Sequence, residues 1–235
     1  MVENGVISKD RPMKFTEYPD SEMMMIDLAN VLAGELKNAL LTHDRASFAV
    51  PGGTTPGPIF DALCAVDLEW DRIDVMLTDE RWVPETSDRS NTQLLRKRLL
   101  IEKAAAAHYI PLYAPTETPE EGIPALADAI APCLPISVML LGMGADMHTA
   151  SIFPGADKLQ EALTTNATLV PMRAPGAPEP RVTLSAAVLN GAMSRHIVII
   201  GEEKRAALEK ATTMLPEEAP VAAVLQGAIV HWARA

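Results

Sequence analysis

The stretch ISVMLLGMGADMHTASIFPG spans residues 136–155, and it decides which fold the chain is expected to adopt. Its first six residues, 136–141, form an apolar run that is typical of a strand buried on both faces of a sheet. Gly142 and Gly144 then open a turn, and Asp146 and His148 follow, two positions apart. Because ligands bind at the carboxyl ends of strands in open parallel sheets, this turn is where we expect a catalytic base.

Strand and helix alternate through most of the chain. Strands are predicted at 46–50, 73–78, 136–141, 182–184, 196–200 and 229–232, and helices at 21–43, from 58, from 90, and at 119–131, 185–189 and 202–213. This alternation indicates an α/β fold of the Rossmann-like type, with a doubly wound, mainly parallel sheet flanked by helices. The chain has 235 residues and no internal repeat, so we expect a single domain, 1–235.

The charge, apolar content and cysteine count of the chain limit which partners it can bind and where it is expected to act. A formal net charge of −11 argues against sequence-independent nucleic-acid binding, which needs clustered Lys and Arg, but leaves a small anionic substrate open. No apolar stretch approaches the ~20 residues of a membrane span, and residues 1–14 lack a signal-peptide pattern. We therefore expect a cytoplasmic protein without membrane contact. Cys64 and Cys133 are too few and too far apart for a disulfide framework or a thiolate metal site.

The first candidate binding site is the turn that follows the strand at 46–50. Between this strand and the next helix, backbone N–H groups, two hydroxyls and the helix dipole would favour an anion. The turn matches neither a Walker loop nor a dinucleotide fingerprint, and a plain tight turn explains it equally well when it is taken alone. Its residues are Gly52, Gly53, Thr54 and Thr55.

The second candidate site comes at the end of the strand at 73–78. There Arg81 could bind a phosphate bidentately, and Asp79 could orient an imidazole or ligand hydroxyls. Asn91 follows Ser90 at the predicted start of a helix and completes this set. A solvated surface ion pair is the alternative explanation of these charges.

The histidine turn itself permits several interpretations. Taken singly, His148 fits a structural histidine, and Gly142 and Gly144 fit a tight turn. The five histidines of the chain are far apart and form no familiar metal-ligand pair, so we expect no metal. The dinucleotide motif is incomplete and no nucleophile elbow is present, so neither a nucleotide cofactor nor an acyl-enzyme serine is indicated.

Two cations further along the chain are candidates for the same site. Arg181 begins a predicted strand after a Pro-rich loop at 171–180, and Lys204 lies in the first turn of a predicted helix after Gly201. A cation at a helix N-terminus opposes the helix dipole, which favours Lys204 facing an anion. A solvated surface position is the default for either residue alone.

Together these motifs closely resemble the 6-phosphogluconolactonases of the pentose phosphate pathway. The family's motifs occur in order as GGTTP at 52–56, DERWVP with SN at 79–91, GMGADMHTASIFPG at 142–155 and RVTL at 181–184. The resemblance covers about residues 46–204. It implies a fold shared with glucosamine-6-phosphate deaminases and ribose-5-phosphate isomerases, no metal or cofactor, and hydrolysis of 6-phosphoglucono-1,5-lactone to 6-phosphogluconate.

The chemistry of lactone hydrolysis suggests roles for the candidate residues. His148 would activate water as a general base, with Asp79 or Asp146 fixing its tautomer. Backbone N–H groups of the glycine turns would stabilise the oxyanion. The Gly53–Thr55 turn, Arg181 and Lys204 would hold the phosphate, and Arg81 would assist them or contact the sugar.

Two positions depart from the family pattern. Met147 stands where the family usually has glycine, and the Pro-rich loop lacks the family's lysine, which leaves Arg173 as a further candidate for the phosphate.

Two other functions stay open. A sugar-phosphate deaminase or isomerase shares the fold, but deaminases carry a glutamate five residues after the histidine, where this chain has Phe153. A non-enzymatic sugar-phosphate sensor would need the anion site but not the base. We expect the protein to act as a monomer on a small sugar-phosphate lactone.

Overall fold

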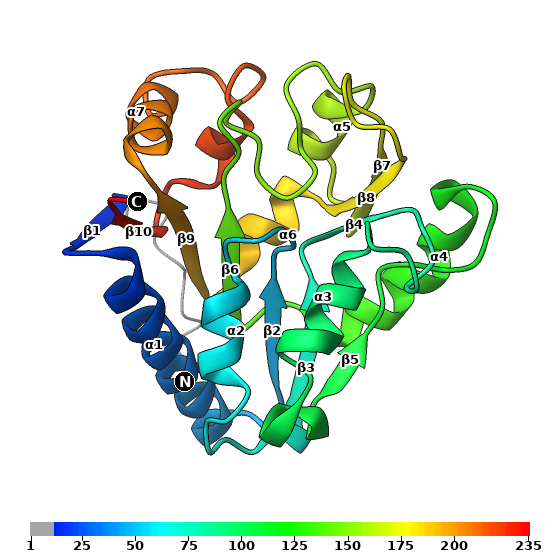
Figure 1. The fold of residues 1–235 in the computed structure, drawn as a ribbon. Helices are drawn as coiled ribbons and strands as arrows, with labels where there is room; N and C mark the ends of the chain where they lie inside the picture. Colours follow the sequence, from blue (N-terminus) through cyan, green and yellow to red (C-terminus); the bar gives the residue numbers. More distant parts are fainter. Residues whose placement is uncertain (1–11) are drawn as a thin grey trace, which may run out of the picture.

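The computed structural model describes residues 12–235, and its centre is a seven-stranded sheet (Figure 1). Every neighbouring pair of its strands runs parallel. In spatial order the strands are β1 (Lys14–Tyr18), β10 (Ile229–Ala233), β9 (Ser194–Ile200), β6 (Val138–Gly142), β2 (Ala46–Val50), β3 (Ile73–Leu77) and β5 (His108–Ile110). The expected doubly wound parallel sheet is confirmed.

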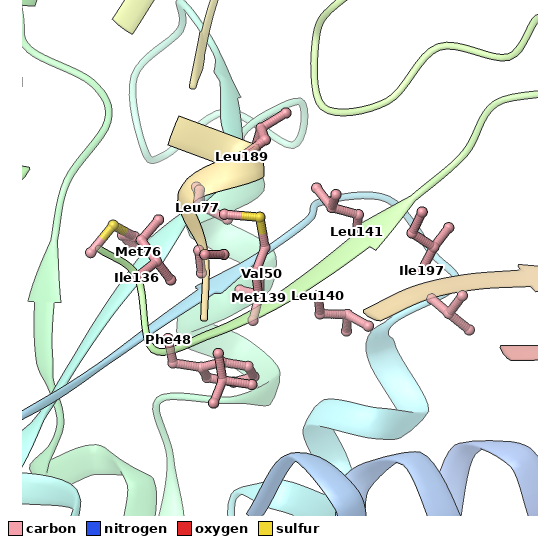
Figure 2. Packing of buried hydrophobic residues seen from close by; sticks show 14 of the residues in the cluster. Phe48, Val50, Met76, Leu77, Ile136, Met139, Leu140, Leu141, Leu189 and Ile197 are labelled. Carbon is pink, nitrogen blue, oxygen red and sulfur yellow. The ribbon is translucent and has the colours of Figure 1, made fainter. Parts of the chain in front are cut away.

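The central strands are buried on both faces, which is why they read as nearly continuous apolar runs. All five residues of β2 and all five of β3 are buried. Figure 2 shows this packing, in which Leu141 of β6 and Ile197 of β9 are direct partners in the ladder. Each such side chain contributes roughly 1.5–3 kcal/mol when it leaves water.

Helices cover both faces of the sheet. In Figure 1, α2 and α3 lie in front of the sheet and α6 lies behind it. The first helix begins at an Asp20 cap, whose carboxylate accepts from the Met23 N–H at 2.8 Å, and it buries a stripe that includes Leu28, Leu32 and Leu36. The helices are α1 (Ser21–Thr42), α2 (Gly57–Leu63), α3 (Asn91–Arg98), α4 (Pro119–Ile130), α5 (Leu159–Thr164), α6 (Ala186–Gly191) and α7 (Glu202–Ala211).

A second, three-stranded antiparallel sheet stands beside the first. It consists of β4 (Asp79–Arg81), β8 (Arg181–Leu184) and β7 (Leu169–Met172), in that order. The strand at 182–184 was predicted, but its assignment to the parallel sheet was wrong. Apolar patterning identifies a strand without naming its partner, and here Thr78 joins β3 directly to β4 while its carbonyl accepts from the Leu184 N–H at 2.9 Å.

Strand order creates the crevice where a ligand would bind. From β2 the chain continues outward to β3 and β5, then returns to β6 on the other side of β2 and continues to β9 and β10. The connections therefore diverge between β2 and β6, and a crevice opens at the carboxyl ends of these two strands. The turns that follow β2 and β6 are the two glycine turns of the sequence.

Several short elements were not predicted, namely β1, β4, β5, β7 and α5. The edge strand β1 is largely exposed, and β5 has only three residues, so neither presents a long apolar run. No helix within residues 12–235 is both long enough and apolar enough to cross a membrane. The expected lack of a signal peptide concerns residues 1–14, most of which lie outside the described part of the chain.

Candidate active site

A cavity of about 270 Å³ opens at the carboxyl ends of β2 and β6. Twelve of the fourteen residues proposed from the sequence line it, the exceptions being Asp146 and Arg173. The twelve are Gly52, Gly53, Thr54, Thr55, Asp79, Arg81, Asn91, Gly142, Gly144, His148, Arg181 and Lys204, and Pro51, Pro56, Met143, Ala150 and Val198 complete the lining. Segments far apart in sequence therefore meet in one cavity.

The turn after β2 needs both of its glycines. Gly53 has a φ of 82°, in the left-handed region that favours glycine. A Cβ on Gly52 would lie 2.0 Å from Oδ1 of Asn91, so only glycine allows this close approach. The helix that follows, α2, has only seven residues, so the helix dipole adds less to this site than the sequence suggested.

Asn91 is held at the cavity by Glu80, a residue that the sequence analysis did not single out. The Glu80 carboxylate is fully buried and accepts from the backbone N–H groups of Asn91 and Thr92, both at 2.8 Å. It also accepts from the Ser90 and Thr92 hydroxyls and from the Arg81 N–H. Burial raises the pKa of this carboxyl, and the hydrogen bonds oppose that shift.

The alternation of a strand gives the signal that could have found Glu80. Asp79 and Arg81 both face the cavity, so the residue between them must point to the opposite side. A carboxylate at that position is buried and needs donors, which the start of α3 supplies.

His148 is oriented by Asp146. Asp146 Oδ1 lies 2.5 Å from His148 Nδ1 and also accepts from the His148 backbone N–H at 3.2 Å. The hydrogen bond to His148 lowers the pKa of Asp146. An ionised carboxylate only accepts, so we assign the proton to Nδ1, which leaves Nε2 with a free lone pair. No described residue forms a hydrogen bond with Nε2.

Asp79 has different partners. Its Oδ2 accepts from the Ser151 hydroxyl at 2.5 Å, and its Oδ1 accepts from the Thr78 hydroxyl at 3.3 Å. Asp79 is buried and lies close enough to Arg181 to act on it electrostatically. Of the two carboxylates considered from the sequence, Asp146 is therefore the one that hydrogen-bonds to His148.

Met147 adopts a backbone conformation that favours glycine. Its φ is 65°, in the left-handed region, which costs a residue with a Cβ about 1 kcal/mol or more. The conformation is held by hydrogen bonds at both ends, from the Met147 N–H to the Gly144 carbonyl and from the Val221 N–H to the Met147 carbonyl, each 3.0 Å long. These hydrogen bonds hold the turn in a conformation that usually favours glycine.

Two arginines face each other across the small sheet. Arg81 of β4 and Arg181 of β8 are direct partners in the antiparallel ladder. Arg181 is only 8% exposed, and burial lowers the pKa of its guanidinium. The Nε atoms of both arginines are buried and have no hydrogen-bond partner within residues 12–235. Like charges directly opposite each other are destabilising, so an anion bound between the side chains would stabilise the pair.

Lys204 completes the positive side of the cavity. It lies near the start of α7, which follows Gly201 with a φ of 89°. No described residue forms an ion pair or a hydrogen bond with its ammonium group. Arg173, by contrast, pairs with Glu120 at 2.7 Å and does not line the cavity, so the interpretation of Arg173 as a phosphate ligand is not supported.

Residues 12–235 contain no group of three or more His, Cys, Asp or Glu side chains that could hold a metal ion. The cavity instead combines an imidazole with a free nitrogen, a carboxylate that orients it, and three cations. This set can bind an anionic group and move a proton beside it.

The profile of the family described as glucosamine-6-phosphate isomerases/6-phosphogluconolactonase matches residues 19–232. The chain belongs to this family. Among curated members, the 6-phosphogluconolactonases of Mesorhizobium japonicum and Pseudomonas aeruginosa are each 40% identical to the chain, over 215 and 210 residues. These alignments cover 90% of both chains in the first case, and 87% of this chain and 88% of the relative in the second.

Solved structures of family members have the same architecture. A 6-phosphogluconolactonase from Shewanella baltica superposes with a TM-score of 0.92 at 31% identity, covering 94% of this chain and 97% of the other. A monomeric glucosamine-6-phosphate deaminase superposes with a TM-score of 0.74 at 16% identity, covering 94% of this chain and 97% of the other, which shows the shared fold alone.

Proposed function

We propose that this protein hydrolyses 6-phospho-D-glucono-1,5-lactone to 6-phospho-D-gluconate, acting as a monomer whose single domain spans 1–235. The observation that carries the proposal is the facing pair of Arg81 and Arg181, two guanidinium groups that line the same cavity as His148. A phosphate would satisfy the pair, and a base beside it would act on the sugar end of the same molecule.

The phosphate end is assigned to the cationic side of the cavity. Guanidinium groups bind phosphate oxygens through paired N–H donors, and Lys204 adds a third charge. The Thr54 and Thr55 hydroxyls, which also line the cavity, are further donors for the phosphate.

The chemistry is assigned to His148. Its free Nε2 takes a proton from water as the water oxygen forms a bond to the lactone carbonyl carbon C1. When the intermediate collapses, the C1–O5 bond breaks and the imidazolium returns a proton to the departing ring oxygen. Asp146 holds the proton-bearing Nδ1 and stabilises the imidazolium between these steps.

The oxyanion needs donors other than Gly144. The Gly144 N–H donates to the His148 carbonyl at 3.0 Å, so it serves the turn and not the substrate. The Gly52–Gly53 turn is the remaining glycine turn of the cavity, and we assign the oxyanion to it.

A deaminase is the nearest alternative within the family. The position at which deaminases carry a glutamate is Phe153, and its ring lies against His148 with centroids 4.3 Å apart. An apolar ring cannot exchange a proton there, which favours the lactonase. A sensor would leave the pair of His148 and Asp146 without a purpose.

One experiment separates these functions. Purified protein is given freshly made 6-phosphogluconolactone with spontaneous hydrolysis subtracted, and in parallel glucosamine 6-phosphate, each before and after exhaustive chelation. We expect fast lactone hydrolysis that survives chelation, and no release of ammonia. Ammonia release at a comparable rate would favour the deaminase, binding without turnover would favour the sensor, and activity restored by a divalent ion would reveal a metal site.

A further inference from the structure

Phe153 contacts two functional groups from outside the cavity. Its ring and the imidazole of His148 have centroids 4.3 Å apart and planes tilted by 36°. The guanidinium of Arg181 lies over the same ring, with Cζ 5.4 Å from its centroid. Phe153 is half-buried and does not line the cavity. One aromatic ring therefore connects the proposed base to a proposed phosphate ligand.

The backbone brings this ring back to the histidine. Ala150 has a φ of 50°, and Thr149 and Ile152 pair as an isolated bridge in which the Ile152 N–H donates to the Thr149 carbonyl at 3.0 Å. The chain reverses in this tight turn, so Phe153 lies beside His148 although it is five residues further on. The contact thus depends on a defined turn and not on chance proximity along an extended chain.

A single hydrogen bond does not fix the plane of an imidazole. The bond from Nδ1 to Asp146 sets the tautomer, but the ring can still turn about that bond. A flat ring packed against the imidazole removes this freedom, because offset-stacked and tilted rings have preferred geometries. The direction of Nε2 then follows from both contacts together.

We propose that Phe153 is a positioning residue for His148, and that its π face stabilises the imidazolium formed when His148 accepts a proton. The inference rests on the proposed function, in which that proton comes from the attacking water. The negative face of an aromatic ring attracts a nearby cation, so a ring at this position favours the protonated form of the base during turnover. The same attraction holds the Arg181 guanidinium at a fixed place relative to the base.

Two replacements distinguish the effect of the aromatic face of Phe153 from the effect of its apolar volume. Phe153→Leu keeps apolar volume without an aromatic face, and a fluorinated phenylalanine introduced at 153 keeps the ring shape while weakening the charge on its face. Phe15→Leu is the matched control, because Phe15 also stacks on a ring, that of Trp232, and also lies under an arginine, Arg205, away from the cavity.

The expected result is a change in proton transfer more than in binding. Phe153→Leu should lower kcat about three- to tenfold, a larger change than in KM. The acid limb of the pH–rate profile should move to lower pH by about half a unit in both Phe153 variants, because the protonated base loses its attraction to the ring. Phe15→Leu should leave kcat and the profile unchanged.

The proposal is overturned if the fluorinated variant keeps the wild-type pH profile, or if Phe15→Leu shifts the profile as much as Phe153→Leu does. An NMR titration of the His148 ring protons tests the same contact without any turnover. A midpoint shared by the wild type and both Phe153 variants would also overturn it. Wild-type protein that hydrolyses no lactone refutes the proposed function instead, and the titration still decides the role of Phe153.

Discussion

Arg81 and Arg181 are direct partners across the antiparallel ladder of β4 and β8, so two guanidinium groups share one face of a small sheet. Such an arrangement is unfavourable in the empty protein and favourable around an anion. In the proposed function, binding of the substrate phosphate would recover the free energy that the protein loses by placing these charges together. Ligand affinity and thermal stability of arginine variants measure the two sides of this effect.

Arg181→Met should weaken binding without weakening the fold. Loss of a charge-assisted contact, worth roughly 1.5–3 kcal/mol, predicts an affinity for 6-phosphogluconate about 10- to 100-fold lower. Binding of unphosphorylated gluconate should hardly change. The Tm of the ligand-free variant should stay close to that of the wild type, because the loss of repulsion from Arg81 is offset by the loss of attraction to Asp79. Calorimetry and thermal unfolding measure both effects.

Arg96→Met provides the control for the arginine experiment, since Arg96 is ion-paired with Glu85 and does not line the cavity. It should change neither ligand's affinity. Equal losses for 6-phosphogluconate and gluconate in Arg181→Met would move Arg181 out of the phosphate site.

His148→Ala removes the proposed base. We expect kcat to fall by about 10²–10⁴, the usual span for general acid–base catalysis. Binding of 6-phosphogluconate and the circular dichroism spectrum should stay close to those of the wild type, because the side chain is on the cavity wall and not in the core. Near-normal turnover would show that another group activates the water.

Asp146→Asn and Asp79→Asn distinguish the two carboxylates. The amide introduced by Asp146→Asn could present an N–H to Nδ1 and so favour the wrong tautomer, which predicts a fall in kcat of about tenfold or more with a Tm near the wild-type value. Asp79→Asn replaces one of two buried acceptor oxygens by an NH2 group, removes the negative charge that acts on Arg181, and should mainly lower stability, by about 1–3 kcal/mol. Kinetics combined with urea unfolding of both variants would test this division; the reverse pattern would make Asp79 the orienting group.

Met147→Gly and Met147→Val test whether the turn needs a conformation or a side chain. Because φ at this position is 65°, glycine should be tolerated with full activity, whereas a β-branched residue should lose about 1–2 kcal/mol of stability and part of kcat. Thermal unfolding and steady-state kinetics are the measurements. A large loss of activity in Met147→Gly would mean that the methionine side chain itself matters.

Two buried histidines outside the cavity are linked by hydrogen bonds, and they predict that the folded protein loses stability in acid. His231 Nδ1 bonds to the Tyr18 hydroxyl and its Nε2 to His196 Nδ1, each at 2.9 Å, and His196 Nε2 bonds to Glu35 at 2.8 Å. Burial, and then the charge of His196, lowers the pKa of His231 to about 3 from the ordinary value of 6.5, while Glu35 opposes this shift and Lys14 adds to it. The folded protein therefore keeps His231 neutral where the unfolded chain binds a proton.

The sign of the effect follows from this difference. Stability should be unaffected by His231 above about pH 6.5, and should fall by up to about 1.4 kcal/mol per pH unit as the pH drops toward 3. Urea unfolding of the wild type and of His231→Gln at pH 7 and pH 5 tests the prediction. The variant should be less stable at pH 7 but lose less between the two pH values; parallel losses would exclude His231 as the cause.

Sequence alone predicted the central architecture and the residues of the cavity. The strand at 46–50 matches β2 residue for residue, because a strand buried on both faces must be apolar throughout. His148 and Arg81 were proposed because charged or titratable side chains follow strand ends, where parallel sheets place their ligands. Arg181 was proposed because it begins a predicted strand after the Pro-rich loop. The end of a strand can be predicted from the neighbouring residues alone, without knowledge of the rest of the fold.

The sequence of one segment does not show which residues of a distant segment it will contact. The pairing of Arg81 with Arg181, and of Asp79 with Ser151 instead of His148, were decided by tertiary structure. The contacts of His148 with Asp146 and Phe153 form within the single segment 142–155 and depend on the shape of its turn. Thr78 takes the chain from β3 directly into the small antiparallel sheet, and this step determines which arginines meet. Pairings of this kind depend on register and packing between distant segments, which sum many weak contacts across the whole fold, so they are fixed only when the chain is folded.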